Sequence, residues 1–328
     1  SGPGATNLIT AIATAYMDSI PMVAITGQVK RELIGKDAFQ EVDIIGATLP
    51  FTKHSYLVTE VEDIPRIVNE AFHIATTGRP GPVLIDFPMD ALKEVCDEES
   101  NLDINLRGYK LPGKANESQI KKVCEALKKA KKPVLLAGGG ITLSDATNEV
   151  REFVKMTGIP VVSTMMGLGV IPTDDDMFYG MIGSHGRRCA NIMMNRSDLI
   201  IAMGTRLGDR TVANTEGLEK ANKLVHIDID PAEIGKNIQP YIPVVGDIKD
   251  VTEQLIKTIG KTKVNADWKK EVDDLRIETE PPVRNEDNGF VNPRYFLQRL
   301  SEITNSDVYL TTEVGQNQLW SANYFTIK

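Results

Sequence analysis

The middle of the chain contains the run PVLLAGGG at residues 133–140, in which a short apolar stretch leads directly into three glycines. A second apolar run ends in Gly204, and a third, IPVVST, covers residues 159–164. Segments with helical periodicity lie at 145–157 and 186–196. Continuous apolar strands that alternate with helical crossovers are typical of a parallel sheet covered on both faces.

Two further strand patterns, at 224–230 and 242–247, and a helix pattern at 248–259 complete this middle unit. We therefore predict a doubly wound α/β domain over residues 116–260. In such sheets, ligands bind at the carboxyl ends of the strands. The residues that follow the strands are therefore the candidates for a binding site.

The segments on either side of this domain contain fewer strands than a complete sheet. Residues 1–90 show a helix pattern at 5–18 and two clear strands, at 21–27 and 82–88, whereas sheets usually contain about five. Residues 291–328 begin with a helix at about 293–304, preceded by Asn292 and with Pro293 at its first position, and continue into one strand at 308–312. We expect both segments to be parts of larger domains, joined to the middle unit by linkers at 91–115 and 261–290. The chain is thus expected to be an internal piece of a longer polypeptide.

Composition excludes several classes of partner. The 328 residues are 41% hydrophobic and 25% charged, which is ordinary for a globular protein. A net charge of −8 argues against nucleic acid and anionic membranes as partners. No apolar run approaches the ~20 residues that span a bilayer. Three widely spaced cysteines indicate a reducing compartment and no cysteine-based zinc site, so we expect a cytoplasmic protein, or an organellar one if a transit peptide precedes it.

Several strand ends carry residues that suit a nucleotide-like cofactor. The glycines at 138–140 allow close approach to the backbone, and the stretch GTRLGDR at 204–210 includes Arg206, which can pair with phosphate. Asp228 ends another strand, where a carboxylate can hold ribose hydroxyls. The alternative is that the glycines are ordinary turn residues and that Asp247 caps a helix.

A series of motifs then makes the chain resemble a known family. They are SGPGATN (1–7), ITGQV (25–29), DAFQE (37–41), TKH (52–54), GRPGPV (78–83), MGLG (166–169), GSHG (183–186), GTRLGDR (204–210) and VGQNQLW (314–320). In this order they resemble the large subunit of acetohydroxyacid synthase (acetolactate synthase), a thiamine-diphosphate enzyme, over essentially the whole chain. GRPGPV is common to many thiamine-diphosphate enzymes, whereas DAFQE with TKH is more specific.

The resemblance implies a three-domain subunit. Residues 1–90 would be the C-terminal half of a pyrimidine-binding domain, 116–260 a complete Rossmann-like FAD-binding domain, and 291–328 the start of a diphosphate-binding domain. The family's catalytic glutamate lies upstream of Ser1 and its magnesium motif downstream of Lys328. We therefore expect the chain by itself to bind FAD weakly or not at all and to be inactive.

The reaction implied is that of a transferase, acetolactate synthase. Pyruvate is decarboxylated, and the hydroxyethyl carbanion condenses with a second 2-ketoacid, pyruvate or 2-ketobutyrate, in the first common step of branched-chain amino acid (valine and isoleucine) biosynthesis. The implied cofactors are FAD, which does no net redox work, thiamine diphosphate and Mg²⁺. The implied assembly is a homodimer or homotetramer, to which a small regulatory subunit often binds.

The motifs indicate which residues of this sequence resemble the family's site residues. Gln40 resembles a hydrogen-bond partner near the thiamine, and Phe39 and Lys53 resemble residues at the substrate channel, where a lysine suits an anionic ketoacid. A solvated surface lysine is the alternative for Lys53. We predict no metal ligand in this chain. The residues that resemble the FAD set are Arg79, Gly139, Thr164, Met165, His185, Gly204, Arg206, Asp209, Asp228, Ile229 and Asp247, and those that resemble the thiamine-diphosphate set are Gly315, Gln316 and Asn317.

Three alternatives stay open at this point. The first is a sister thiamine-diphosphate enzyme, such as glyoxylate carboligase or pyruvate oxidase, whose products differ from acetolactate. The second is a flavin or nicotinamide oxidoreductase, in which a bound cofactor turns over with the substrate. The third is a module that only binds a nucleotide.

Overall fold

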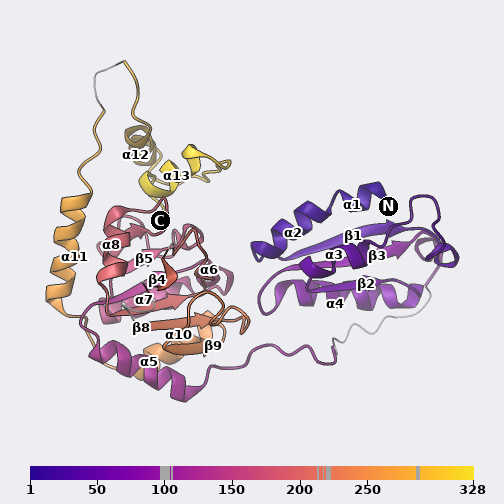
Figure 1. The fold of residues 1–328 in the computed structure, drawn as a ribbon, viewed down its shortest axis with the longest axis horizontal. Coiled ribbons are helices and arrows are strands. Elements are labelled where there is room, and N and C mark those ends of the chain that lie inside the picture. The colour runs from indigo at the N-terminus through magenta and orange to yellow at the C-terminus, as the bar shows by residue number, and fades with distance from the viewer. Residues whose placement is uncertain (97–103, 105, 213, 217, 219–222, 286–288) are drawn as a thin grey trace. The chain divides into compact units, whose positions relative to one another are not determined.

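The computed structural model describes residues 1–96, 104, 106–212, 214–216, 218, 223–285 and 289–328. They form two compact units, Ser1–Leu111 and Pro112–Lys328 (Figure 1). Each unit has its own sheet and its own hydrophobic core. Within the described residues, no helix is both long and apolar enough to cross a membrane.

Unit 1 is built on a three-stranded parallel sheet with the order β1-β3-β2. Its strands are β1 (Met22–Gln28), β2 (His54–Leu57) and β3 (Pro82–Pro88). Every residue of the central strand β3 is buried, which explains its continuous apolar sequence. We expected two strands here and missed β2, because it is short and none of its side chains is fully buried.

Helices cover both faces of this sheet. The helices α1 (Pro3–Thr6), α2 (Ile9–Met17) and α3 (Ile44–Thr48) contribute to the core on one face. Helix α4 (Ile64–Thr76) packs on the other face. The single helix expected at 5–18 is therefore two helices, α1 and α2.

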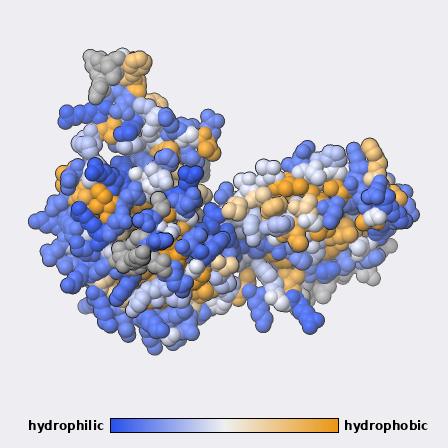
Figure 2. Space-filling model, viewed as in Figure 1, coloured by the Kyte–Doolittle hydropathy of each residue, from blue (hydrophilic) through white to orange (hydrophobic). Residues whose placement is uncertain are grey.

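Unit 1 keeps hydrophobic side chains at its surface. Figure 2 shows hydrophobic residues on the visible face of this unit, and the exposed ones include Ile25 at 64% and Phe39 at 90%. Ile25 lies in the middle of β1, an edge strand of the sheet. An apolar residue in the middle of a parallel strand is normally covered, so this part of the β1 face lacks the cover that α4 gives to its neighbours.

Unit 2 contains a six-stranded parallel sheet with the order β6-β5-β4-β7-β8-β9. The chain builds outward from β4 to β6, then returns to place β7 on the other side of β4. This reversal is the topological switch point at which doubly wound sheets open a crevice. The strands are β4 (Pro133–Ala137), β5 (Val161–Ser163), β6 (Phe178–Met181), β7 (Leu199–Met203), β8 (Lys223–Asp228) and β9 (Ile242–Val245).

Helices on both faces confirm the predicted doubly wound arrangement. Alternate residues of one strand serve two cores: Leu135 belongs to the core with α5, α7 and α10, and Leu136 to the core with α8 and α11. We missed β6, which contains Gly180 at φ +110° and pairs with β5 in an irregular register. The helices are α5 (Glu117–Lys129), α6 (Gly140–Leu143), α7 (Thr147–Thr157), α8 (Arg188–Arg196), α10 (Ile248–Ile259) and α11 (Ala266–Thr279).

The segment 261–290, expected to be a linker, contains α11 and part of the unit 2 core. Trp268 on this helix is 2% exposed, and its indole Nε1 donates a hydrogen bond to the Pro133 carbonyl at 3.0 Å. Val272 and Leu275 are buried beside it. The charged residues on the outer face of α11 hid this narrow apolar stripe in the sequence.

Two other expectations about the connecting segments need correction. In the segment 91–115, Leu106 and Tyr109 pack against the core of unit 1, while residues 97–103 and 105 lie outside the described residues. The strand expected at 308–312 is not formed. Among the residues that the structure describes, no strand pairs with that segment, and an extended segment without a neighbour is unstable.

The chain ends in two helices, α12 (Pro293–Ile303) and α13 (Gln316–Tyr324). Helix α12 begins as expected: the Asn292 side chain accepts a hydrogen bond from the Arg294 amide, and Pro293 occupies the first turn. Helix α13 follows the extended segment and begins directly after Gly315.

Candidate functional site

The loops after β4 and β7 touch each other through their backbones at the switch point. The Gly140 amide donates to the Gly204 carbonyl at 3.0 Å. A Cβ atom on Gly138 would lie 2.2 Å from the Gly204 oxygen, and one on Gly204 would lie 2.6 Å from the Gly140 Cα. Contact between the two loops therefore requires these glycines. The sequence alone did not decide whether they serve a turn or a ligand.

The loop after β5 joins the same rim. It contains a short 3₁₀ helix at Met165–Gly167, and the Thr164 amide donates to the Ala137 carbonyl at 2.9 Å. A Cβ atom on Gly139 would lie 2.8 Å from the Met166 Cβ. The loops after β4, β5 and β7 thus form a continuous edge of closely packed backbone.

The loop after β7 places charged groups on this rim. Leu207 is 1% exposed and has a φ of +53°, so it anchors the loop while its neighbours stay at the surface. The Arg206 side chain is exposed, and its carbonyl accepts a hydrogen bond from Asn237 Nδ2 at 2.8 Å. The Asp209 side chain is 90% exposed. A guanidinium and a carboxylate here suit phosphate and hydroxyl groups of a ligand.

The loop after β6 reaches the loop after β7. The Ser184 amide donates to the Arg210 carbonyl at 3.1 Å, and a Cβ atom on Gly183 would lie 2.3 Å from that oxygen. The exposed His185 follows, and its carbonyl accepts a hydrogen bond from Asn323 Nδ2 on α13 at 3.0 Å. His185 is therefore brought to the same edge of the sheet.

The strands β8 and β9 complete this edge. Asp228, the last residue of β8, is 8% exposed and accepts a hydrogen bond from the Asp230 amide at 3.0 Å. Ile229 follows it and is half-buried. The middle-unit residues expected at a cofactor site all lie at or just after the carboxyl ends of the six strands: Gly139, Thr164, Met165, His185, Gly204, Arg206, Asp209, Asp228, Ile229 and Asp247.

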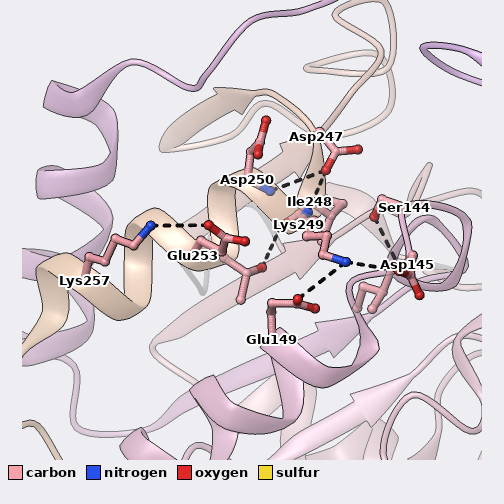
Figure 3. A network of polar contacts seen from close by, with 11 residues as sticks. Ser144, Asp145, Glu149, Asp247, Ile248, Lys249, Asp250, Glu253 and Lys257 are labelled. Carbon is pink, nitrogen blue, oxygen red and sulfur yellow. Dashed lines mark hydrogen bonds and ion pairs between the residues drawn. The ribbon is translucent and has the colours of Figure 1, made fainter.

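Asp247 caps helix α10, as the alternative interpretation of the sequence suggested. Its carboxylate accepts hydrogen bonds from the Lys249 and Asp250 amides at 2.8 and 3.4 Å. The Lys249 ammonium reaches Asp145 at 3.0 Å and Glu149 at 3.6 Å, which raises the pKa of Lys249 chiefly through the hydrogen bond with Asp145 (Figure 3). These contacts hold the start of α10 against the turn between α6 and α7.

In unit 1 the structure separates the residues expected at the active site. The loop with Phe39 and Gln40 follows β1 and returns to its carboxyl end, where Gln28 Nε2 donates to the Val42 carbonyl at 2.8 Å. Lys53 precedes β2 at the opposite, amino end of the sheet. A seven-residue strand such as β1 spans about 20 Å. Within this unit, Lys53 is therefore not brought together with Phe39 and Gln40.

Lys53 instead contacts the end of helix α4. Its ammonium donates to the Thr77 carbonyl at 2.6 Å and also to the Ile74 carbonyl, so it binds the free carbonyls of that helix terminus. Arg79 lies in the following loop, and its Nε donates to the Ser19 hydroxyl at 2.9 Å. Both cations lie at the amino end of the unit 1 sheet.

The thiamine-diphosphate candidates lie together at the start of α13. Gly315, Gln316 and Asn317 are all exposed. The N-cap residue Gly315 has no side chain to bind the first amides of the helix, which leaves the Gln316 and Asn317 amides for an anion. Asn317 Oδ1 accepts a hydrogen bond from the Gln318 amide at 2.8 Å.

A buried acid in unit 1 was missed by the sequence reasoning. Asp86 in β3 is 1% exposed and accepts hydrogen bonds from the Thr26 hydroxyl at 2.7 Å and from Gln28 Nε2 at 3.0 Å. Burial raises the pKa of Asp86. The available signal was one acidic residue inside an otherwise apolar strand.

Comparisons with known proteins give this arrangement a family. A family model described as "Thiamine pyrophosphate enzyme, N-terminal TPP binding domain" matches residues 1–47. A second, described as "Thiamine pyrophosphate enzyme, central domain", matches residues 120–255, which include the whole six-stranded sheet. The chain belongs to the thiamine-diphosphate enzyme family.

Relatives in this family match the chain from end to end. Acetolactate synthase of Mycobacterium leprae is 44% identical over 99% of the chain and 53% of its own length. Acetolactate synthase 1, chloroplastic, of Nicotiana tabacum is 44% identical over 99% of the chain and 49% of its own length. The probable acetolactate synthase large subunit of Methanocaldococcus jannaschii is 41% identical over the full chain and 57% of its own length. The chain thus spans about half the length of the curated relatives it matches.

Proposed function

We propose that this chain is part of an acetolactate synthase. Such an enzyme decarboxylates pyruvate and transfers the remaining two-carbon unit to a second 2-ketoacid, pyruvate or 2-ketobutyrate. The observation that carries this proposal is identity of 41–45% over essentially the whole chain to acetolactate synthases from bacteria, plants and an archaeon. The relatives reported above do not include a glyoxylate carboligase, a pyruvate oxidase or a nicotinamide enzyme, so we do not favour those alternatives.

Thiamine diphosphate is the cofactor for which the family is named, and it provides the electron sink for the reaction when bound. We propose that its diphosphate binds at Gly315, Gln316 and Asn317, because the start of α13 has no N-cap side chain and its first two amides suit an anion. We propose that Mg²⁺ accompanies the diphosphate. Among the described residues, no group of three or more His, Cys, Asp or Glu side chains is placed to hold a metal ion, and we assign no magnesium ligand to them.

We propose that FAD occupies the carboxyl edge of the six-stranded sheet. The side chains present fit it: Arg206 can pair with phosphate, and the buried Asp228 can accept from ribose hydroxyls. The backbone contact of Gly140 with Gly204 keeps side chains out of the switch point, where a dinucleotide lies in doubly wound sheets. Arg79 in unit 1 stays a proposed flavin contact on resemblance alone.

A flavin titration tests this part of the proposal. Arg206→Ala in the full-length protein is expected to weaken FAD binding about tenfold, since it removes one charge-assisted hydrogen bond. Arg196→Ala is the control, because Arg196 is 50% exposed and is the last residue of α8, away from the carboxyl edge of the sheet. The measurement is quenching of flavin fluorescence on binding. Equal losses in the two variants would contradict a specific role for Arg206.

Product analysis tests the activity itself. The full-length protein, supplied with thiamine diphosphate, Mg²⁺, FAD and pyruvate, is expected to form acetolactate, and with added 2-ketobutyrate also acetohydroxybutyrate. Formation of tartronate semialdehyde from glyoxylate or of acetyl phosphate, without acetolactate, would replace the proposal by a sister enzyme. Flavin reduction in proportion to substrate consumed would indicate an oxidoreductase.

Assembly and location are further proposals. We propose a homodimer or homotetramer, with a small regulatory subunit as an additional partner, and light scattering of the full-length protein would give the number of chains. We propose a cytoplasmic location, or an organellar one if a transit peptide precedes this sequence. The tobacco relatives are named chloroplastic.

A further inference from the structure

The loop that carries Phe39 and Gln40 is exposed but firmly held. Phe39 is 90% exposed, and Gln40 adopts a φ of +60°, a conformation that non-glycine residues keep only when their surroundings impose it. A Cβ atom on Gly2 would lie 2.7 Å from the Gln40 oxygen, so backbone from α1's start packs directly on this residue. The loop therefore presents its side chains from a defined backbone.

Glu41 closes the loop on itself. Its Oε2 accepts a hydrogen bond from the Ala38 amide at 2.9 Å, and its Oε1 accepts one from the Gly35 amide. These backbone donors, led by Gly35, lower the pKa of Glu41. The segment from Gly35 to Glu41 is thus held together by its own hydrogen bonds. Its position relative to the sheet depends on the contacts at its C-terminal end.

Gln28 holds that end to the sheet. Its Nε2 donates both to the Val42 carbonyl at 2.8 Å and to Asp86 Oδ2 at 3.0 Å. Its Oε1 accepts a hydrogen bond from the Val29 amide at 2.9 Å. Gln28 is 8% exposed, and its bond to Asp86 is buried.

Asp86 helps to fix which way the Gln28 amide points. Both carboxylate oxygens of Asp86 accept hydrogen bonds, so the Gln28 NH₂ group faces Asp86 and the Val42 carbonyl, while the Gln28 oxygen faces the Val29 amide. A carboxylate that is 1% exposed is costly to bury, and a neutral residue would fill the same space at less cost. Packing alone therefore does not account for an acid at this position.

We propose that Asp86 is a positioning residue, which acts through Gln28 to fix the loop that presents Phe39 and Gln40. The catalytic consequence rests on the proposed function, whereas the structural consequence does not. Asp86 itself contacts no reacting group in this scheme. Its role is to keep one orientation of the Gln28 amide and hence one position of the Val42 backbone.

The test compares Asp86→Asn with Thr26→Val in the full-length protein. An asparagine can present a donor where the Asp86 carboxylate accepts, which weakens the hold on the Gln28 NH₂ group and, through it, the bond to Val42. Thr26→Val is the matched control, because it removes the other hydrogen bond to Asp86, at 2.7 Å, and leaves Gln28 unchanged. Hydrogen exchange of residues 35–42 is expected to rise about tenfold in Asp86→Asn and to stay within about twofold in Thr26→Val.

Kinetics give the second measurement. In Asp86→Asn, kcat for acetolactate is expected to fall about tenfold, while the affinity for thiamine diphosphate changes less than about twofold, because the proposed diphosphate contacts at the start of α13 lie outside this loop. Gln28→Met is expected to reproduce both results, since it removes the bridging amide and keeps similar volume. If Asp86→Asn does not fold, Gln28→Met tests the proposal in its place.

Two results would overturn the proposal. One is a folded Asp86→Asn or Gln28→Met protein with unchanged exchange in residues 35–42. The other is an equal rise in Thr26→Val, which would make the effect one of general stability. Failure of the unsubstituted protein to form acetolactate would instead overturn the proposed function, and the exchange measurements would still decide the role of Asp86.

Discussion

Replacing Gly138 by alanine is expected to lower the free energy of unfolding of unit 2 by about 3 kcal/mol or more. The added Cβ would lie 2.2 Å from the Gly204 oxygen and 2.6 Å from the Gly204 carbonyl carbon. Both are backbone atoms at the end of β7, and β7 is hydrogen-bonded to β4 and β8, so they have little freedom to move. The two loops must therefore separate, which opens the switch point.

Gly208→Ala is the matched control for this substitution. Gly208 lies in the loop after β7, and a Cβ atom there would meet nothing within 4 Å. Its cost is expected to stay within about 0.5 kcal/mol. Urea denaturation followed by circular dichroism measures both variants, and a loss of about 3 kcal/mol corresponds to roughly 6–12 °C in Tm for a unit of this size. Similar stability of the two variants would contradict the close contact at Gly138.

Trp268→Ala is expected to lower the free energy of unfolding by about 3–5 kcal/mol. The indole is 2% exposed in the core shared by α8 and α11, and its Nε1 bond to Pro133 ties α11 to the start of β4. The substitution leaves a cavity and removes a donor from a buried carbonyl. The size of the effect shows whether α11 is part of the folded core of unit 2 or only a connecting segment.

Ile277→Ala serves as the control on the same helix. Ile277 is 76% exposed, so its truncation is expected to change stability by less than about 0.5 kcal/mol. Thermal unfolding of both variants, monitored by intrinsic fluorescence and circular dichroism, gives the comparison. If Trp268→Ala were as mild as Ile277→Ala, the segment would be a linker as the sequence first suggested.

The sequence predicted the long buried strands well because each is a continuous apolar run bounded by Pro or Gly. The bounds of β3 (Pro82–Pro88) and β4 (Pro133–Ala137) agree with the prediction to the residue. Strand β2 escaped because none of its side chains is fully buried, β6 because Gly180 interrupts its apolar run, and α11 because a charged face surrounds its stripe. Short strands gain most of their stability from neighbours that a local pattern does not reveal.

In the candidate site, too, some positions follow from local sequence and others depend on long-range contacts. Residues at the carboxyl ends of parallel strands meet at one edge for topological reasons, so the strand-end candidates could be grouped before any coordinates were known. The direction of the Lys53 side chain depends on its contact with α4, which no local pattern encodes. The bond between Gln28 and Asp86 joins residues 58 positions apart and was equally invisible.

The order of the strands also has a consequence for how the molecule assembles. β4 and β7 are neighbours in the sheet, yet β5, β6 and α8 intervene along the chain. Pairing over such a separation is slow, because a long loop must close before any contact rewards it. During synthesis, a nascent chain that ends before Leu199 can form β4, β5 and β6 of unit 2 but has no crevice. The carboxyl edge of the six-stranded sheet is therefore expected to arise late, when the second half of the sheet docks onto the first.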